Sequence, residues 1–233
     1  MKIAVLSDIH GNADALTAVL VEAKKNNVQE LLILGDCVGY YYHTDLVFEK
    51  LFEWECHWVF GNHEKLLLSF IDGDNTVKDK LRKKYGRGFD YCVEKLPEDI
   101  LRFIRELKAT KKIDFENVSI LMCHGSPWNY DEYIYPDASI DKLMQCDQRG
   151  VDFVLMGHTH YPFVFKGTHS IIANVGSVGQ SRVLGGVANW ALIDINNKSY
   201  VTKHTLYNTE KLKKEVKLII PELSYLWEIL DRK

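Results

Sequence analysis

Short apolar runs alternate with longer amphipathic stretches along this chain. The apolar runs Ile3–Leu6, Leu31–Leu34 and His57–Phe60 predict buried strands. The stretch after the first run predicts a helix, because its apolar residues recur every three or four positions and Asn12 is suited to cap it. The apolar face of that helix would consist of Ala15, Leu16, Val19, Leu20 and Ala23. Thr44–Trp54 predicts a second helix, and the alternation is typical of an α/β domain.

The stretch from Glu64 to Lys108 has little strand character. Within it, Lys78–Tyr85 and Pro97–Lys108 predict helices, and Pro97 is suited to the first turn of the second one. No linker rich in Gly, Pro or Ser bounds this stretch. We therefore expect one domain over residues 1–233, with a helical elaboration at about residues 64–108.

The second half of the chain is mostly predicted strand. The expected strands are Val118–Met122, Phe153–Leu155, Phe163–Phe165, Ile171–Ala173, Ala191–Ile195 and Tyr200–His204. Asn196-Asn197 indicates a hairpin turn between the last two. The tail from Thr209 predicts a helix with one apolar stripe, which either packs on the body of the protein or forms a homodimer contact. That stripe consists of Leu223, Leu226, Trp227 and Leu230.

Composition narrows the class of protein. The formal net charge of -3 over 233 residues argues against nucleic-acid binding by bulk charge, since such domains are strongly basic. The five cysteines form no Cys-x-x-Cys pair, so we expect a reducing compartment and no disulfide framework. No apolar run approaches the ~18 residues that a membrane span needs, and the first run is too short for a secretory signal. We expect a cytoplasmic protein without a membrane partner.

Side chains able to bind metals follow five of the apolar runs. These are Asp8 and His10, Asp36, Asn62 with His63, His124, and His158 with His160. Ligands of open α/β sheets bind beyond the carboxyl ends of the strands, so we expect these residues to converge. The pairs Asp8/His10 and His158/His160 are two positions apart, and in extended backbone such side chains point the same way.

The mixture of donor types indicates which metals would bind. Imidazole nitrogens with carboxylate and amide oxygens, and no thiolate, favour Mn²⁺, Fe or Zn²⁺ over Ca²⁺ or an iron–sulfur cluster. Seven ligands are too many for one tetrahedral ion. They fit two ions about 3.5–4 Å apart that share a carboxylate. Taken alone, each residue is more simply explained as a turn, cap or core residue. Five strand ends that all carry such residues favour one shared metal site. We expect two divalent ions, Mn in vitro, with Fe, Zn, Ni or Mg as alternatives.

The same residues form motifs that are familiar in this order. Asp8-Ile9-His10, Gly35-Asp36, Gly61-Asn62-His63-Glu64, His124-Gly125 and Gly157-His158-Thr159-His160 resemble the five signatures of the calcineurin-like metallophosphoesterases. Residues 174–180 resemble a stretch of the small YfcE-like phosphodiesterase branch. The resemblance implies an α/β (α+β) fold: a four-layer αββα sandwich of two mixed β-sheets flanked by helices.

The resemblance also implies a division of the ligands. One ion would be held by Asp8, His10, Asp36 and His160, and the other by Asp36, Asn62, His124 and His158. His63 would contact the phosphate and protonate the leaving group, which a histidine with a reference pKa near 6.5 can do at neutral pH. A metal-bridging hydroxide would be the nucleophile. The implied activity is that of a phosphodiesterase or phosphatase on small-molecule or nucleotide phosphoesters.

Several residues outside the motifs are further candidates. Arg182 could bind a substrate phosphate, and Asn12 could contact the phosphate or cap its helix. The aromatic segments 40–42 and 128–130 could stack on a nucleobase or pack against the helical elaboration. The basic runs Lys80–Lys84 and Lys211–Lys217 are interpreted as solvated helix faces.

Other functions share this fold. A non-catalytic protein-binding scaffold, like the retromer subunit that lacks the catalytic histidine, is disfavoured because His63 and all seven ligands are present. Within the enzymes, a DNA nuclease, a Ser/Thr protein phosphatase and a dinucleoside-polyphosphate hydrolase stay open. The motifs do not separate phosphomonoester from phosphodiester hydrolysis, since both use the same ligands.

Overall fold

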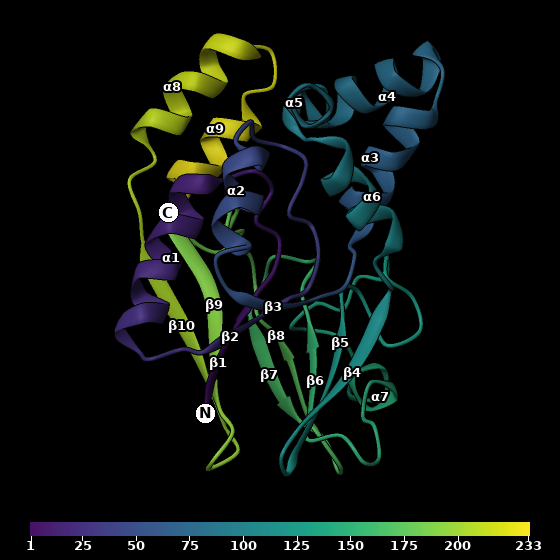
Figure 1. Cartoon of the computed structure of the whole chain (residues 1–233), viewed down its shortest axis with the longest axis vertical. Helices are drawn as coiled ribbons and strands as arrows, with labels where there is room; N and C mark the ends of the chain where they lie inside the picture. Colours follow the sequence, from purple (N-terminus) through teal and green to yellow (C-terminus); the bar gives the residue numbers. More distant parts are fainter.

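Two five-stranded mixed β-sheets lie face to face in the computed structural model, which describes residues 1–233 (Figure 1). The first sheet contains β1 (Lys2–Leu6), β2 (Glu30–Ile33), β3 (Glu55–Trp58), β9 (Val187–Asp194) and β10 (Ser199–Leu206). The second contains β4 (Thr110–Phe115), β5 (Val118–Cys123), β6 (Phe153–Met156), β7 (Phe163–Lys166) and β8 (Ile171–Asn174). Their strand orders are β10-β9-β1-β2-β3 and β4-β5-β6-β8-β7.

Each sheet contains three parallel strands, with antiparallel strands added on one side in the first sheet and on both sides in the second. Strands β1, β2 and β3 pair in parallel in the first sheet, as do β5, β6 and β8 in the second. The carboxyl ends of parallel strands meet at one edge of a sheet. The loops that follow β1, β2, β5 and β6 can therefore build one site from both sheets.

The central strand β1 is buried on both of its faces. Ile3 and Val5 point into the core between the two sheets, while Ala4 and Leu6 point into the core beneath the helices. Successive side chains of a strand face opposite sides, so a strand between two cores needs apolar residues throughout. This is why Ile3–Leu6 reads as an unbroken apolar run rather than as an alternating one.

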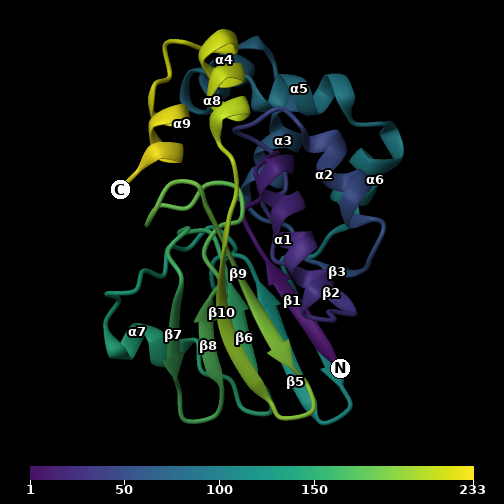
Figure 2. The ribbon, with the colours of Figure 1, turned by 90° about the vertical axis from the view of Figure 1, so that its left-hand side faces the viewer.

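Helices flank the two sheets unevenly. Those over the outer face of the first sheet are α1 (Ala13–Lys25) and α2 (Thr44–Leu51), joined in the same core by α8 (Glu210–Ile219) and α9 (Tyr225–Glu228). The outer face of the second sheet has the single short helix α7 (Ile140–Gln145) (Figure 2). The expected fold class, two mixed sheets flanked by helices, is confirmed, with the second helical layer much thinner than the first.

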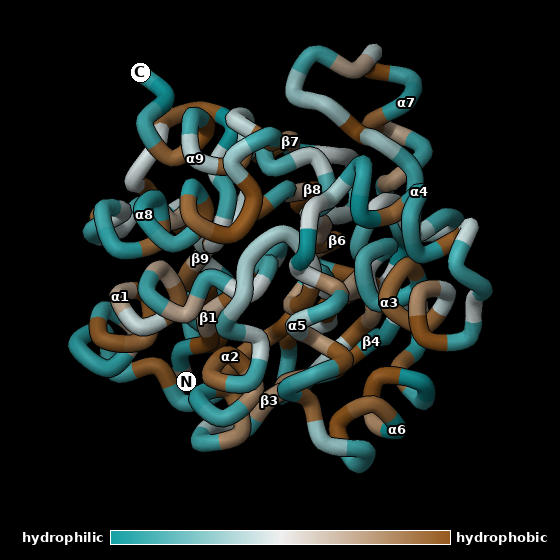
Figure 3. Tube along the Cα trace, turned by 90° about the horizontal axis from the view of Figure 1, so that it is seen from above, coloured by the Kyte–Doolittle hydropathy of each residue, from teal (hydrophilic) through white to brown (hydrophobic).

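Four helices form the expected elaboration beyond the ends of the strands (Figure 1). They are α3 (Asn62–Asp72), α4 (Asn75–Tyr85), α5 (Gly88–Lys95) and α6 (Glu98–Glu106). Viewed from above, they carry apolar and polar residues side by side, as helices with one buried face do (Figure 3). Their inner faces contribute Leu67, Leu81, Phe89 and Ile104 to the same core cluster as α1.

The prediction for the third strand is displaced by two residues. The strand was expected at His57–Phe60 but lies at Glu55–Trp58. The last two residues of the expected strand, Val59 and Phe60, lie in the loop that follows, where their apolar side chains are buried. The helix expected at Thr44–Trp54 ends at Leu51.

Outside the helical elaboration, two elements were not expected from the sequence. Strand β4 is an edge strand with exposed lysines. Polar residues suit an edge strand, but they leave no apolar pattern from which the strand could be predicted. Helix α7 has only six residues, too few for a periodic signal.

The C-terminal tail packs on the body of the protein, as one of the two alternatives proposed. The expected helix is interrupted at Pro221, because proline removes a backbone donor and cannot continue a helix. Leu226 and Leu230 are buried in the core shared with α1, so they are not available for a dimer contact. The hairpin turn between β9 and β10 is confirmed. No helix has both the length and the apolarity to cross a bilayer, and all five cysteines are free thiols.

Candidate active site

The loops after four strands and the start of α3 bring the seven candidate ligands together. Asp8 and His10 follow β1, Asp36 follows β2, and Asn62 is the first residue of α3. His124 comes directly after β5, and His158 and His160 follow β6. The metal-competent atoms of six of them, and of His63, form three overlapping groups, and the atoms within each group lie within 4.8 Å of one another. These groups are Asp8 with His10 and His160, His10 with Asp36 and His63, and Asp36 with His124 and His158.

Five of these residues have left-handed backbone, which corrects one sequence argument. The φ angles are 54° at Asp8, 51° at His10, 54° at Asp36, 66° at His158 and 64° at His160. The i, i+2 pairs were expected to converge through extended backbone, in which side chains two positions apart point the same way. They converge instead through these left-handed turns. Left-handed residues other than glycine cost of order 1–3 kcal/mol each and persist where the surroundings hold them. Here Asp8 N donates to Gly35 O and His10 N donates to Asp36 O.

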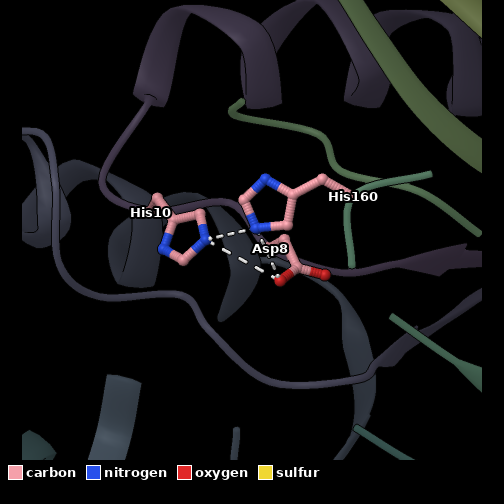
Figure 4. Close-up of side chains that lie close together, drawn as sticks. All are labelled: Asp8, His10 and His160. Atoms are coloured by element: carbon pink, nitrogen blue, oxygen red, sulfur yellow. Dashed lines mark hydrogen bonds and ion pairs between the residues drawn. The ribbon is translucent and has the colours of Figure 1, made fainter. Parts of the chain in front are cut away.

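The group around Asp8 has the features of a cation site (Figure 4). His10 Nδ1 lies 3.0 Å from Val38 O, and His160 Nδ1 lies 2.7 Å from Gln180 O. A carbonyl oxygen only accepts, so both Nδ1 atoms carry hydrogen and, in the neutral rings, both Nε2 atoms present lone pairs. These two Nε2 atoms are 3.1 Å apart.

An oxygen of Asp8 completes this group. Asp8 Oδ1 lies 3.2 Å from His160 Nε2 and 3.7 Å from His10 Nε2, and it is buried without a hydrogen-bond partner. The other oxygen, Oδ2, accepts from His158 N at 2.9 Å. Ligands of a common ion with bonds of about 2.0–2.2 Å lie roughly 3–3.5 Å apart, so the spacing of these atoms suits a shared ion.

The second group is built around His124. Its Nε2 lies 3.1 Å from Asn62 Oδ1 and 3.3 Å from Asp36 Oδ2, and its Nδ1 lies 2.7 Å from Leu34 O. Asp36 Oδ2 is also 3.8 Å from His10 Nε2, so one carboxylate borders both groups. The buried Nε2 of His158 has no hydrogen-bond partner. The residues therefore fit two ions with Asp36 between them.

The electrostatics of the site favour positive charge. Burial opposes a charged imidazole, yet the carboxylates of Asp36 and Asp8 raise the pKa of His124 to about 10. Burial and the neighbouring His160 hold the pKa of His10 well below its usual value. Burial and the neighbouring His124 lower the pKa of His158 to about 3. In the metal-free protein His124 is therefore protonated at neutral pH, and its positive charge lies beside the carboxylates of Asp8 and Asp36.

His63 lies in the first turn of α3, beside both groups. Its ring centroid is 4.6 Å from that of His10, 4.7 Å from Tyr40 and 4.9 Å from Tyr85. Its backbone N donates to Asp36 Oδ1 at 2.7 Å, and its Nδ1 is buried without a partner. Burial and His10 hold the pKa of His63 well below its usual value, so the ring is neutral at rest.

Glu64 holds the two loops of the site in place. Its carboxylate accepts from the backbone N–H groups of Gly61, Asp36 and Cys37 at 2.7, 2.8 and 2.7 Å. It thereby ties the loop after β2 to the start of α3. Burial raises the pKa of Glu64 to about 7. The sequence placed Glu64 in a motif but indicated no role for it.

A small pocket opens above these groups. It measures about 130 Å³, and five of its lining residues are Asp36, Asn62, His63, His158 and His160. The others are Tyr40, Lys84, Tyr85, Tyr133 and Arg182. Of these, Arg182 was expected as a substrate residue. Lys84 was expected on a solvated helix face, and it is exposed there while also lining the pocket. Tyr40 packs beside Tyr85 of the helical elaboration, and such packing was one of the two roles expected for the aromatic segment 40–42.

Tyr85 and Tyr133 were missed by the sequence argument. The Tyr133 ring lies 4.0 Å from that of His158 and is 49% exposed. The tyrosines at 130, 133 and 135, soon after His124, were the signal that could have pointed to it.

Asn12 is occupied by the fold, which corrects its expected substrate contact. Its Oδ1 accepts from Ala15 N at 3.1 Å, as a helix cap does. Its Nδ2 donates to Gly179 O at 2.8 Å and to Tyr207 Oη at 3.1 Å. Only 1% of the residue is exposed, so the capping alternative holds. The aromatic segment 128–130 does not line the pocket.

Comparisons with known proteins agree with this geometry. The family model described as the calcineurin-like phosphoesterase superfamily domain matches residues 1–198. The uncharacterized protein MJ0912 of Methanocaldococcus jannaschii is 27% identical over 238 residues, covering 94% of both chains. The structure of hypothetical protein PH1004 from Pyrococcus horikoshii OT3 is similar with a TM-score of 0.83 and 22% identity, covering 99% of this chain and 98% of that one. A metallophosphoesterase from Sphaerobacter thermophilus is similar with a TM-score of 0.78, at the same identity and coverage.

Proposed function

This chain belongs to the calcineurin-like phosphoesterase superfamily, and we propose that it hydrolyses small phosphoesters with two divalent metal ions bound in the pocket. The family makes it a phosphoester hydrolase and implies divalent metal ions. The number of ions, the roles of single residues and the substrate are the subject of the proposal.

One observation carries the metal assignment. In the neutral rings the Nε2 lone pairs of His10 and His160 face each other at 3.1 Å, beside an oxygen of Asp8 that has no hydrogen-bond partner. Such an arrangement is repulsive unless a cation lies among the three atoms. We assign one ion to Asp8, His10, Asp36 and His160, and the other to Asp36, Asn62, His124 and His158. Mn²⁺ is the ion of choice in vitro, with Fe, Zn, Ni or Mg as alternatives.

The bound ions would supply Lewis acidity and an activated water. The chain's own residues do the rest. Asp36 holds the two groups at a fixed spacing, and Arg182 in the pocket wall binds a phosphate of the substrate. His63 delivers the proton to the leaving oxygen, because an anionic phosphate bound beside it raises its pKa. In the net reaction water adds across the P–O bond, with its hydroxyl going to phosphorus and its proton to the leaving oxygen.

The shape of the pocket supports a small substrate. A pocket of about 130 Å³ is below the usual ~300–1,000 Å³ of ligand sites, so only the phosphoryl end of a substrate fits inside it. The half-exposed Tyr133 at its rim offers a face to an aromatic leaving group or nucleobase. We therefore favour a phosphodiesterase or phosphatase on small-molecule or nucleotide substrates over a nuclease or a protein phosphatase.

We assign residues 1–233 to a single domain. Helices α3–α6 share one apolar cluster with α1, α2 and the tail, so the elaboration has no core of its own.

An assay with controlled metal content tests the proposal. The protein is stripped with a chelator, reloaded with Mn²⁺ and given mono- and bis-(p-nitrophenyl) phosphate. We expect turnover only after reloading, and two ions per chain by elemental analysis. His169→Asn is the control, because His169 is an exposed histidine outside the pocket. A folded, metal-loaded protein that turns over neither substrate, nor any nucleotide or phosphopeptide, would refute the proposal and favour the scaffold alternative.

A further inference from the structure

Two cationic side chains in the pocket wall have no carboxylate partner. Lys84 comes from the last turn of α4 and Arg182 from the loop after β8, and both line the pocket beside the candidate ligands. Neither lies within salt-bridge distance of a carboxylate, whereas Arg82, on the same helix turn as Lys84, pairs with Asp79 and Asp90. A cation without a carboxylate partner beside a phosphate site is available to bind an anion.

The C-terminal segment holds the backbone of both residues. Tyr225 Oη donates to Lys84 O at 3.3 Å, and Arg232 Nη1 donates to Arg182 O at 2.5 Å. Lys84 Nζ also lies 4.8 Å from the centroid of the Tyr85 ring, over the pocket side of α4. The backbone of each residue is therefore anchored while its charged end stays free.

The charges exceed what the cleaved group requires. Two divalent ions with the carboxylates of Asp8 and Asp36 and the hydroxide nucleophile leave a formal charge of about +1, against the ~-2 charge of one phosphate monoester. Lys84 and Arg182 then add two positive charges, of which the cleaved phosphate needs only one.

The space around Arg182 continues beyond the pocket. Arg182 also lines an adjoining hollow of about 420 Å³, together with Tyr161, Tyr225 and Arg232. A substrate that reaches the metal groups with one phosphate can therefore extend past Arg182 and place its organic part between aromatic rings.

We propose, on the basis of the function proposed above, that Lys84 and Arg182 form a second anion subsite. The preferred substrate then carries a further phosphate next to the one that is cleaved, as organic polyphosphates such as nucleoside polyphosphates do. The planar fork of Arg182 suits two oxygens of that phosphate, and Lys84 adds a point charge from the other wall. The organic part lies in the hollow beside Tyr161 and Tyr225.

Two inhibitors that differ by one phosphonate-type group test this subsite. Inorganic phosphate and methylenediphosphonate compete with p-nitrophenyl phosphate in the Mn²⁺-loaded protein, and the measured quantity is the ratio of their inhibition constants. We expect the diphosphonate to bind at least about tenfold more tightly than phosphate. Lys84→Gln and Arg182→Gln each lower that ratio roughly tenfold. Chelation of metal by the diphosphonate in solution is the same for every variant, so it cancels in the comparison.

Lys83→Gln is the matched control, since Lys83 is the exposed neighbour of Lys84 and does not line the pocket. It leaves the ratio unchanged. If Lys84→Gln weakens both inhibitors equally, Lys84 serves the cleaved phosphate and the second subsite is refuted. A ratio unaffected by either variant refutes it as well. If the wild type hydrolyses nothing, the proposed function fails, and calorimetry of diphosphonate binding to the loaded protein still tests the subsite separately.

Discussion

The pocket has a floor and a wall that follow different physical rules. The floor consists of the seven candidate ligands: Asp36, Asn62, His158 and His160 line the pocket, and Asp8, His10 and His124 are buried in the same ligand groups beside them. Its side chains are almost all fully buried, and backbone groups orient them, as Val38 O and Gln180 O do for two imidazoles. The wall consists of Lys84, Tyr133 and Arg182, which are exposed or half-exposed, and its two cations have no carboxylate partner.

The difference reflects what each part must satisfy. Buried carboxylates and imidazoles are costly unless their charges and lone pairs are compensated, so the geometry of the floor allows few alternatives. An exposed lysine or tyrosine costs little in any arrangement, so the wall is free to suit a substrate. We expect changes in the floor to abolish the reaction and changes in the wall to alter which substrate is chosen.

The largest effect is expected from Asp36→Asn. Asparagine keeps the shape but removes the charge that borders both metal groups, so both ions should bind weakly. We expect kcat to fall by roughly 10³-fold or more, with fewer than two ions per chain by elemental analysis. His169→Asn should leave both quantities unchanged. Full metal content in the Asp36 variant would show that the floor does not depend on a shared carboxylate.

His63→Asn should lower kcat by roughly 10²–10⁴ while the metal content stays the same. The loss should be greater for an alkyl phosphate than for p-nitrophenyl phosphate, because a poor leaving group needs the proton more. Equal losses on the two substrates would remove His63 from its role as the acid.

Glu64→Gln tests the support beneath the floor. One oxygen that accepts a backbone N–H becomes a donor, which leaves a buried N–H unsatisfied. We expect the free energy of unfolding to fall by about 2–3 kcal/mol in urea titrations. Glu94→Gln, at an exposed position, is the control. An unchanged midpoint would mean that other bonds hold the two loops together.

The metal-free protein should lose stability as pH rises above neutrality. The folded pKa of His124 is raised to about 10 and the unfolded value is about 6.5, so the stabilising charge is fully present below 6.5 and disappears towards 10. Between pH 7 and 8.5 we expect a loss of about 1–2 kcal/mol by urea titration. The Mn²⁺-loaded protein should lose less, because the ions replace the proton. The same slope in both forms would contradict this account.

The smallest effect is expected from the wall. Tyr133→Ala should raise KM for a nucleotide substrate about fivefold, corresponding to ~1 kcal/mol of stacking, with little change in kcat. Tyr133→Phe keeps the ring and should behave like the wild type. A change in kcat of the alanine variant instead would indicate that Tyr133 positions His158, whose ring it contacts.

Much of the floor follows from the sequence alone. Each ligand comes shortly after an apolar run, and strands that end at the same edge must bring such residues together. The cap of α1 at Asn12 and the α/β alternation follow from local patterns in the same way, whereas the four-layer sandwich was implied by the family resemblance. These features are predictable because burial and hydrogen bonding act on residues that are close in the chain.

Only the tertiary structure determined the remainder. Val59 and Phe60 resemble strand residues because they are apolar, yet they are buried in a loop, and apolarity does not distinguish the two. The left-handed backbone of Asp8 and His10 depends on bonds to another loop, so no local pattern reveals it. Lys84 reaches the pocket because α4 packs against the site and the tail anchors its backbone. An exposed lysine on a helix has the same local pattern whether it faces a substrate or only water.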